Sequence, residues 1–410
     1  MATRKRSNSV KEVLTQLEPT TTTAPLVKSS STNKTAKRPA WTAPAGPLAW
    51  LVKPVQTLQV ILVVVAAWAA LERFLPADTA NPLTPFLFIS YPLPAEVGDV
   101  EPKYGKGPRD LAFLSFYIIV FSFLRQSITE YLIRPFARGL GLKGESKITR
   151  FMEQAYAVVY FSASGAFGLY VMAKQPTWWY KTEHFWLEYP HWRMDGALKS
   201  YYLLQFSYWL QQMIILVMGL EKPRSDFREL VIHHIVTLWL VGWSYMINLT
   251  LIGTSVFVSM DLPDICLAFS KCLNYLDLQR TSEISFAFFM VVWHYMRHYL
   301  NLRMLWSVWY EYDLIPAQWR SWTSAEWLDK AHKGWWLFYG FGTGSIPHWM
   351  KYQIFAPILA LQLVNTFWSF LIWRILIRMI TGTAPARDVR EEGEDDEDEE
   401  ELAVEEKKKR

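Results

Sequence analysis

The sequence contains very little cysteine, little histidine and no signal-peptide core. Its two cysteines, Cys266 and Cys272, exclude a disulfide scaffold and any cysteine-rich zinc site. Both lie in or beside an apolar stretch, where cysteine behaves as a small apolar side chain. No apolar core of the signal-peptide type lies near Met1. The first long apolar segment is therefore expected to act as the membrane signal itself.

Aromatic and aliphatic side chains are abundant instead. Hydrophobic residues make up 51% of the 410 residues and aromatic residues 16%, with 21 Trp, 20 Tyr and 24 Phe. This aromatic content is excessive for a soluble core. It is typical of a bilayer protein, whose helix ends carry belts of amphipathic rings. The composition therefore predicts a membrane protein.

The net charge of +4 conceals a strong asymmetry. Residues 388–406 hold 13 of the 38 acidic side chains, so residues 1–387 hold 25 acidic side chains against 37 basic ones. In a soluble protein, such a basic surplus would suggest nucleic acid. Here the basic residues flank apolar segments, as the positive-inside rule and anionic headgroups require. We therefore expect membrane lipid, and no nucleic acid, as their partner.

Eight apolar segments each approach the roughly 20 residues that a helix needs to cross the hydrocarbon core. Because such segments cross a bilayer as helices, the predicted fold is all-α. It is a polytopic membrane helix bundle with about eight transmembrane helices and disordered polar tails. A very short turn separates the fifth and sixth segments. The predicted segments are 56–75, 110–133, 152–173, 200–220, 229–248, 251–270, 284–304 and 352–380.

The basic residues also predict the orientation. With a cytosolic N-terminus, the basic loops 134–150 and 222–228 lie on the cytosolic side. An even number of spans then returns the C-terminus to the cytosol. The Trp- and Tyr-rich loops 174–199 and 305–350 would face the lumen.

Two short motifs lie in the tails. Lys407 and Lys408 are fourth and third from the end, which resembles the dilysine signal that cytosolic coat proteins read for retrieval to the endoplasmic reticulum. We therefore expect a multi-pass protein of the endoplasmic reticulum membrane with both termini cytosolic. A basic patch that balances the acidic run is the alternative reading. Ser9 lies in an R-x-R-x-x-S pattern and is a predicted phosphorylation site.

Ionisable side chains inside membrane spans cost about 2.5–3.5 kcal/mol each and therefore usually mark function. The fifth span follows Arg224-Ser225-Asp226-Phe227-Arg228 and contains His233-His234, then Thr237 and Ser244. Neighbouring helix positions differ by about 100°, so the two histidines cannot serve one site equally. His233, Thr237 and Ser244 share one face.

The sixth span contains Asp261-Leu262-Pro263-Asp264, followed by Lys271 and Asn274. The two carboxylates are three residues apart on one face, and Pro263 loosens the helix between them. Buried carboxylates need partners, and a histidine on the preceding helix is the expected one. The alternative role is a hydrogen bond that pairs helices.

The seventh span carries His294, Arg297 and His298 on one face. These side chains either complete the polar cavity or bind a phosphate. The alternative is that Arg297 and His298 lie near a headgroup region. A membrane-embedded histidine that a carboxylate orients is the equipment of a general base or nucleophile. From the residues alone, the chemistry is acyl transfer or hydrolysis on a lipid within the membrane.

A longer pattern resembles the signature of the longevity-assurance ceramide synthases, in the TLC-domain superfamily, and most closely their fungal type. Met260 replaces a histidine that often precedes the first aspartate in the animal enzymes, and a homeobox-like region is absent. The matching residues are Arg224-Ser225-Asp226-Phe227-Arg228-Glu229-Leu230-Val231-Ile232-His233-His234-Ile235-Val236-Thr237, Ser244-Tyr245, Asn248, Gly253, Asp261-Leu262-Pro263-Asp264 and Lys271.

The resemblance implies N-acylation of a sphingoid base by a fatty acyl-CoA, without a metal or another cofactor. It places His233 where the acyl group is accepted and Asp264 where that histidine is oriented, with His234 and Asp261 in the same site. A direct one-step transfer, with His233 as the base, is the alternative. It also implies a small single-span accessory subunit or a homodimer as partner. The further substrate-binding candidates are Arg224, Asp226, Arg228, Thr237, Ser244, Lys271, Asn274, His294, Arg297 and His298.

These inferences divide the chain into four regions. Residues 1–50 form a disordered basic cytosolic tail, and residues 51–135 hold the first two transmembrane helices. Residues 136–380 form the TLC-type catalytic domain. Residues 381–410 form an acidic cytosolic tail that ends in the dilysine-like sequence.

Two other functions compete with this interpretation. A di-iron lipid hydroxylase needs about eight histidines at short spacings, whereas the whole chain has only eight and several are scattered. A non-catalytic lipid sensor or carrier of the TLC superfamily would not need the double histidine together with two aspartates.

Overall fold

The computed structural model describes residues 48–76, 78–220, 227–317 and 349–381. Most of the two predicted disordered tails lies outside these residues, as do Ser9, Lys407 and Lys408, whereas Ala49 and Trp50 of the predicted N-terminal tail belong to the short helix η2. Arg224 and Asp226 of the predicted site also lie outside them. The limits of the predicted regions stay predictions.

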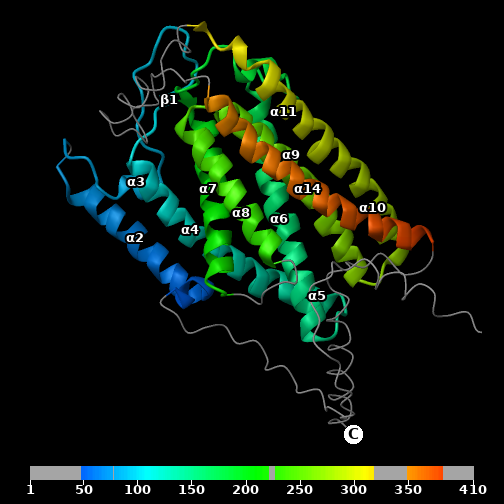
Figure 1. Ribbon diagram of the computed structural model, residues 1–410. Coiled ribbons are helices and arrows are strands. Elements are labelled where there is room, and N and C mark those ends of the chain that lie inside the picture. Colours follow the sequence, from blue (N-terminus) through cyan, green and yellow to red (C-terminus); the bar gives the residue numbers. More distant parts are fainter. Residues whose placement is uncertain (1–47, 77, 221–226, 318–348, 382–410) are drawn as a thin grey trace, which may run out of the picture. The chain divides into compact units, whose positions relative to one another are not determined.

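Helices dominate the described residues, whose only strands are the short antiparallel pair β1 (Lys103–Tyr104) and β2 (Met194–Asp195). Figure 1 shows the helices side by side. The long helices are α2 (Pro54–Phe74), α4 (Arg109–Ser127), α6 (Glu145–Ala173), α7 (Gly196–Val217), α8 (Phe227–Met246), α9 (Thr250–Tyr275), α10 (Gln279–Trp293), α11 (Asn301–Tyr310) and α14 (Met350–Ile380). The shorter ones are η2 (Ala49–Val52), α3 (Thr84–Leu87), η3 (Ile128–Ile133), α5 (Arg134–Gly139), η4 (Thr182–Phe185), η5 (His294–Leu300) and η6 (Tyr312–Leu314).

Five helical stretches within the described residues are long and apolar enough to cross a membrane. They are α2, the continuous stretch from α4 through η3 to α5, α6, α9 and α14. The predicted all-α membrane bundle is thereby confirmed, while the number of eight spans stays a prediction. Helix α8 contains His233 and His234, and α7 contains three glutamines, so polar side chains lower their mean hydropathy.

The predicted seventh span, 284–304, is the middle of a longer helical stretch. This stretch runs from α10 through η5 to α11, over residues 279–310. The middle element, η5, is a π-helix. Single π turns are rare inside α-helices and often occur at functional sites, because the extra residue re-aims the side chains around it.

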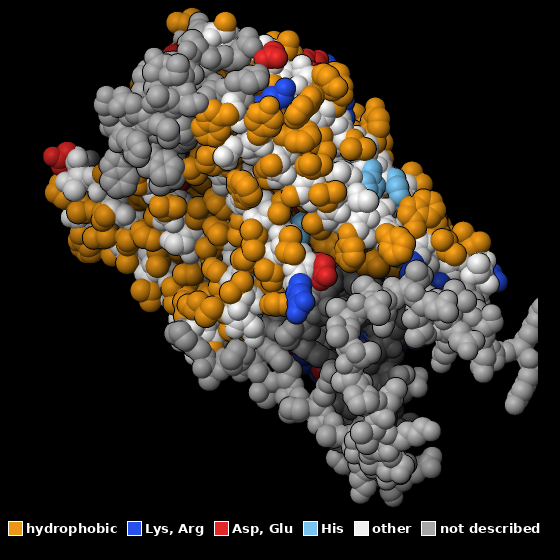
Figure 2. All heavy atoms as spheres, viewed as in Figure 1, with side chains coloured by type: hydrophobic (Ala, Val, Ile, Leu, Met, Phe, Trp, Pro, Cys, Tyr) orange, Lys and Arg blue, Asp and Glu red, His pale blue; other side chains and the backbone are white. Residues whose placement is uncertain are grey.

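Helix α9 occupies the interior of the bundle, where it packs against α6, α8 and α10. Two thirds (67%) of its apolar stretch is buried, against 6% for α2, which packs on α4. Apolar side chains on the outer helices therefore face outward, where the lipid would lie. Figure 2 shows this on one face, which carries hydrophobic side chains over most of its described surface and few charged ones.

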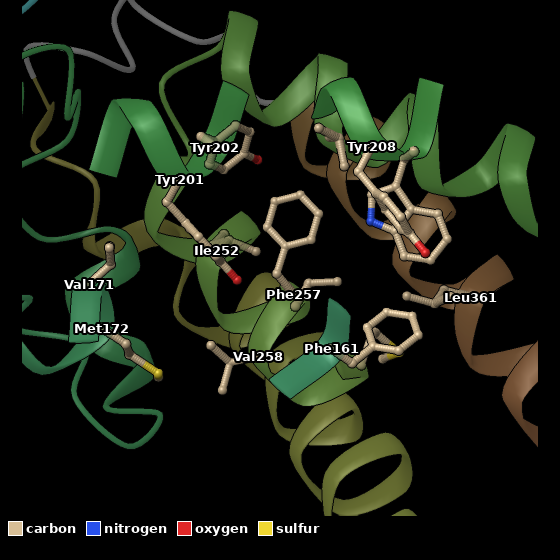
Figure 3. Close-up of a cluster of buried hydrophobic side chains, with 14 of the residues drawn as sticks. Phe161, Val171, Met172, Tyr201, Tyr202, Tyr208, Ile252, Phe257, Val258 and Leu361 are labelled. Atoms are coloured by element: carbon tan, nitrogen blue, oxygen red, sulfur yellow. The ribbon is translucent and has the colours of Figure 1, made fainter. Parts of the chain in front are cut away.

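Aromatic side chains join α7 to α9 in the core (Figure 3). The Phe257 ring of α9 lies with its centroid 5.9 Å from that of Tyr201 and 5.4 Å from that of Tyr202, both on α7. The stacked Tyr160 and Tyr208 rings join α6 to α7 in the same way, with centroids 3.5 Å apart. These contacts fix the spacing of the helices that surround the candidate site.

Two buried lysines connect the α3–α4 loop (residues 88–108) to the bundle. Lys106 donates from Nζ to the Tyr245 carbonyl oxygen at 2.6 Å and to the Asn248 side chain, in the turn between α8 and α9. Lys199 of α7 donates from Nζ to the loop carbonyl oxygens of Ser90 at 2.8 Å and Gly105 at 2.7 Å, and it forms an ion pair with Asp110 of α4 at 2.8 Å. Burial lowers the pKa of Lys106 to about 7, although the Asp110 carboxylate acts in the opposite direction.

Candidate active site

A cavity lies among α7, α8, α9, η5 and α14, with about 50 Å³ of room for the centre of a water-sized molecule. Its lining runs along α8 from His233 to Ser244, includes Ile247 and Leu249 in the turn that follows, and continues along α9 from Ile252 to Asp264. Most of the lining is aliphatic or aromatic. The strongly polar groups, His233, Asp264 and Arg297, contribute to the wall far from the α8–α9 turn.

His233 is buried and lines this cavity from α8. Its ring is held by aromatic neighbours, with centroid distances of 5.8 Å to Trp209 and 5.1 Å to Trp368. Its Nδ1 is buried and has no hydrogen-bond partner among the described residues. Burial of an unpaired polar atom is costly, so such an atom inside a protein invites a functional explanation.

His234 is buried beside His233 but does not line the cavity. The two rings are almost perpendicular, with centroids 5.7 Å apart. Nδ1 of His234 lies 2.8 Å from the Leu230 carbonyl oxygen. Because a carbonyl oxygen only accepts, Nδ1 carries the proton in this bond and Nε2 keeps its lone pair in the neutral ring.

Asp264 lines the cavity and is paired with an arginine from η5. Its Oδ1 accepts a hydrogen bond from Arg297 Nη2 at 2.6 Å. Arg297 also donates to the Met260 carbonyl oxygen at 3.0 Å and to Asn365 Oδ1 at 3.2 Å, and it is only 3% exposed. The expected hydrogen bond between Asp264 and His233 is therefore not what the structure shows. A charged guanidinium with several donors satisfies a buried carboxylate better than a neutral imidazole does.

Asp261 faces a different set of helices. Its Oδ2 accepts hydrogen bonds from Ser164 Oγ of α6 at 2.8 Å and from Gln205 Nε2 of α7 at 2.7 Å. It is 1% exposed and is not part of the cavity wall. The expectation that Asp261 and Asp264 share one site with a histidine partner is thus not met. Residues three apart on a helix differ by about 60° in direction, and here that angle separates two environments.

The histidines of the seventh span bind α14 instead of lining the cavity. His294 Nε2 accepts a hydrogen bond from Trp373 Nε1 at 2.9 Å, and His298 Nδ1 lies 2.7 Å from Gln362 Nε2. Arg297, between them, is the only one of the three that lines the cavity. The π turn thus directs Arg297 inward, while the two histidines connect η5 to α14.

The remaining predicted residues divide into two groups. Thr237 and Ser244 line the cavity on the same face of α8 as His233. Arg228 is exposed near the start of α8, and Lys271 and Asn274 lie in the last turns of α9, so none of these three is brought to the cavity wall. Within the described ranges, no three His, Cys, Asp or Glu side chains are grouped so that they could hold a metal.

Some residues of the site carry no ionisable group and were therefore not predicted as site residues. Trp209 and Trp368 enclose His233, and Asn365 supports Arg297. Ser164 and Gln205 are the partners of Asp261. Polar residues in otherwise apolar spans were the available signal for Asn365, Ser164 and Gln205, because such residues face partners inside a bundle.

The fold and cavity define a multi-pass membrane protein with an intramembrane histidine–carboxylate site. The TLC domain family matches residues 150–374, from within α6 to within α14. Sphingosine N-acyltransferase lac1 of Schizosaccharomyces pombe is 42% identical over 310 residues, which cover 75% of this chain and 74% of that protein. Ceramide synthase LAG1 of Saccharomyces cerevisiae is 40% identical over 302 residues, covering 73% and 67%.

Similarity extends beyond fungi. Ceramide synthase 4 of Bos taurus is 27% identical over 258 residues, covering 63% of this chain and 58% of that protein. The chain therefore belongs to the TLC-domain family, in the longevity-assurance branch of fungal ceramide synthases. The resemblance that the motif indicated is confirmed.

Proposed function

We propose that this protein is a sphingoid-base N-acyltransferase. It moves a fatty acyl group from acyl-CoA to the amine of a sphingoid base and forms a ceramide or its dihydro or phyto form. The observation that carries the proposal is the buried His233 imidazole, with an unpartnered ring nitrogen, on the wall of a largely apolar cavity. The names of the most similar fungal relatives agree with this reaction.

The cavity dimensions suit a fatty acyl chain. From His233 to Ile247, its wall along α8 and the turn that follows extends over 14 residues, or about 21 Å at 1.5 Å per residue. An extended hydrocarbon advances roughly 1.25 Å per carbon, as C–C bonds of about 1.5 Å require. About 16 carbons therefore fit between His233 and the α8–α9 turn, with the thioester at the polar wall.

In the first step, the unprotonated ring nitrogen of His233 attacks the thioester carbonyl carbon. A C–N bond forms and the C–S bond breaks. The thiolate of CoA leaves, and the proton on the other ring nitrogen is lost to it, which yields a neutral acyl-imidazole and free CoA. The neutral ring that this step requires is favoured because burial disfavours an imidazolium.

In the second step, the sphingoid amine attacks the same carbonyl carbon. Asp264 lines the cavity with 24% of its side chain exposed, and only its Oδ1 accepts from Arg297. We assign Asp264 to hold the incoming ammonium and accept its proton, with Arg297 as a positioning residue. The amide C–N bond forms, the bond to His233 breaks, the imidazole takes the second proton of the attacking amine, and the proton held by Asp264 is released to solvent. His234, whose ring centroid lies 5.7 Å from that of His233, supports this transfer through its Nε2 lone pair.

The proposal also includes the orientation of the protein in the membrane and its partners. Both termini face the cytosol, so that His233, six residues after the start of α8, lies about 9 Å beyond the cytosolic end of that helix. The candidates to hold the CoA phosphates are then Arg228 and Lys271, together with Arg224, which lies outside the described residues. Lys407 and Lys408 bind coat proteins and retain the protein in the endoplasmic reticulum. A small single-span subunit or a second copy completes the assembly, and no cofactor is required.

Ceramide formation by the purified protein tests the activity. Acyl-CoA and a sphingoid base are supplied, and the product is measured by mass spectrometry. We expect wild-type protein to form ceramide and His233→Ala to form none while it still folds. His184→Ala, in the short helix η4 away from the cavity, is the matched control and should remain active. Acyl-CoA binding without any product from wild-type protein would instead indicate a lipid sensor or carrier.

A further inference from the structure

Tyr202 of α7 places a polar group against the middle of the apolar cavity. Its side chain is fully buried and lines the cavity. Its hydroxyl bonds Ser244 Oγ of α8, and Ser244 Oγ donates to the Leu240 carbonyl oxygen at 2.6 Å. Because that carbonyl only accepts, the Ser244 proton is used there, and the Tyr202 hydroxyl is the donor to Ser244.

A glycine on α9 makes room for this phenol. A Cβ atom at Gly253 would lie 1.9 Å from the Tyr202 hydroxyl oxygen and 2.7 Å from two of its ring carbons. Gly253 and Ser244 both line the cavity. The Tyr202 phenol therefore reaches from α7 to both α8 and α9, and any larger residue at 253 would have to displace it.

Aromatic neighbours hold the ring in this position. Tyr245 stacks on Tyr202 with centroids 5.7 Å apart, and Phe257 meets it edge-on at 5.4 Å. Figure 3 shows Tyr202 and Phe257 between α7 and α9. With the ring packed on two sides and the hydroxyl bonded to Ser244, the side chain has little freedom to swing away from an occupant of the cavity.

The Tyr202 hydroxyl therefore lies at a fixed distance from His233 along the cavity. Ser244 is 11 residues after His233 on α8, or about 16 Å along the helix axis. At roughly 1.25 Å per carbon, a chain whose carbonyl carbon is at His233 reaches this level at about its thirteenth carbon. Beyond it, the wall is formed by Ile247, Leu249 and Ile252, which are all apolar.

We infer that Tyr202, held by Ser244 and accommodated by Gly253, is a specificity-determining residue that sets the preferred length of the acyl chain. The inference rests on the proposed acyl transfer and adds a function for the far part of the cavity. The phenol limits the cross-section through which the end of the chain passes toward Ile247 and Leu249. Its position, and not the chemistry at His233, decides how many further methylenes find an apolar site.

Substitutions on the two sides of this contact should act in opposite directions. Gly253→Ala pushes the phenol into the cavity and should shift the products toward shorter chains. Tyr202→Leu removes the phenol and should shift them toward longer chains. The double variant, Gly253→Ala with Tyr202→Leu, has no clash at position 253. Its products should therefore be longer than those of Gly253→Ala alone. Two methylenes gained or lost correspond to a change of more than about tenfold in relative kcat/KM.

The experiment supplies purified protein with an equimolar mixture of saturated acyl-CoAs of 12 to 26 carbons and one sphingoid base. Ceramides are then resolved by mass spectrometry. Tyr180→Phe removes another buried tyrosine hydroxyl bonded to α9, through the Ser255 carbonyl oxygen at 2.9 Å, but outside the cavity. Gly165→Ala adds a methyl group at ordinary contact distance, 3.5 Å from Leu262. Both controls should keep the wild-type profile.

The outcomes distinguish a failure of the chain-length role of Tyr202 from a failure of the proposed acyl transfer. Opposite shifts with recovery in the double variant support it. An unchanged chain-length profile in active Gly253→Ala and Tyr202→Leu proteins overturns it. So does loss of activity on every chain length in both variants, because Tyr202 would then be needed for folding alone. A wild-type protein that forms no ceramide would contradict the proposed function instead.

Discussion

Arg297 is the charge that keeps Asp264 in place, and its removal should be costly. The guanidinium is 3% exposed and donates to Asp264, Asn365 and the Met260 carbonyl oxygen. Truncation of one partner of a buried ion pair leaves the other charge uncompensated, at a cost of about 3–5 kcal/mol. We therefore expect Arg297→Met to lower the free energy of unfolding by that amount and to abolish ceramide formation.

A second substitution separates the charge effect from the loss of packing. Asp264→Asn removes the carboxylate charge but keeps an acceptor for Arg297. The double variant Arg297→Met with Asp264→Asn leaves no unpaired charge, so it should be more stable than Arg297→Met alone. It should still form no ceramide, because the group that receives the amine is absent.

Equilibrium unfolding in mixed micelles measures these differences. The matched control is Lys174→Met, because Lys174 pairs with Glu101 at 2.8 Å and both side chains are exposed, at 37% and 46%. That pair should contribute no more than about 1 kcal/mol. If Arg297→Met is no more destabilising than Lys174→Met, or if the two losses simply add in the double variant, the assignment of Arg297 is wrong.

Three further substitutions probe other parts of the structure. Because burial lowers the pKa of Lys106 to about 7, the unfolded chain binds more protons between pH 7 and 10. The free energy of unfolding should rise by up to about 1.4 kcal/mol per pH unit over that interval through Lys106, and the slope should decrease by that amount in Lys106→Met but not in Lys103→Met. Asp261→Leu should lose about 2–4 kcal/mol in equilibrium unfolding, because Ser164 and Gln205 lose their acceptor; a loss below 1 kcal/mol would show that these bonds contribute little. In a background without Cys266 and Cys272, Arg228→Cys should react with an impermeant thiol reagent from the cytosolic side, and labelling by a lumen-only reagent would overturn the topology.

The long helices, and the face of α8 that lines the cavity, could be predicted from the sequence. Apolar length predicted the segments near α2, α6, α9 and α14, because crossing a bilayer leaves few alternatives to a long helix. The spacing of His233, Thr237 and Ser244 placed all three on the face that lines the cavity. Both inferences depend on local periodicity alone.

Contacts between helices that are distant in the sequence could not be predicted from local periodicity. The pairing of Asp264 with Arg297 joins residues 33 positions apart and depends on the π turn in η5. A one-residue change in helical winding redirects every following side chain, and the residue pattern did not predict the π turn. The division of Asp261 from Asp264 likewise depends on Ser164 and Gln205, which come from two other helices.

A single-turnover reaction without the amine is the most direct test of acyl transfer to His233. Purified protein is mixed with acyl-CoA alone, and free CoA and the mass of the His233 peptide are measured together. We expect one equivalent of CoA to be released and the His233 peptide to gain the mass of one acyl group, which a sphingoid base then removes as ceramide. His233→Ala should show neither signal, whereas His184→Ala should show both. Absence of both signals in a wild-type protein that forms ceramide would contradict the covalent step and leave His233 as a general base.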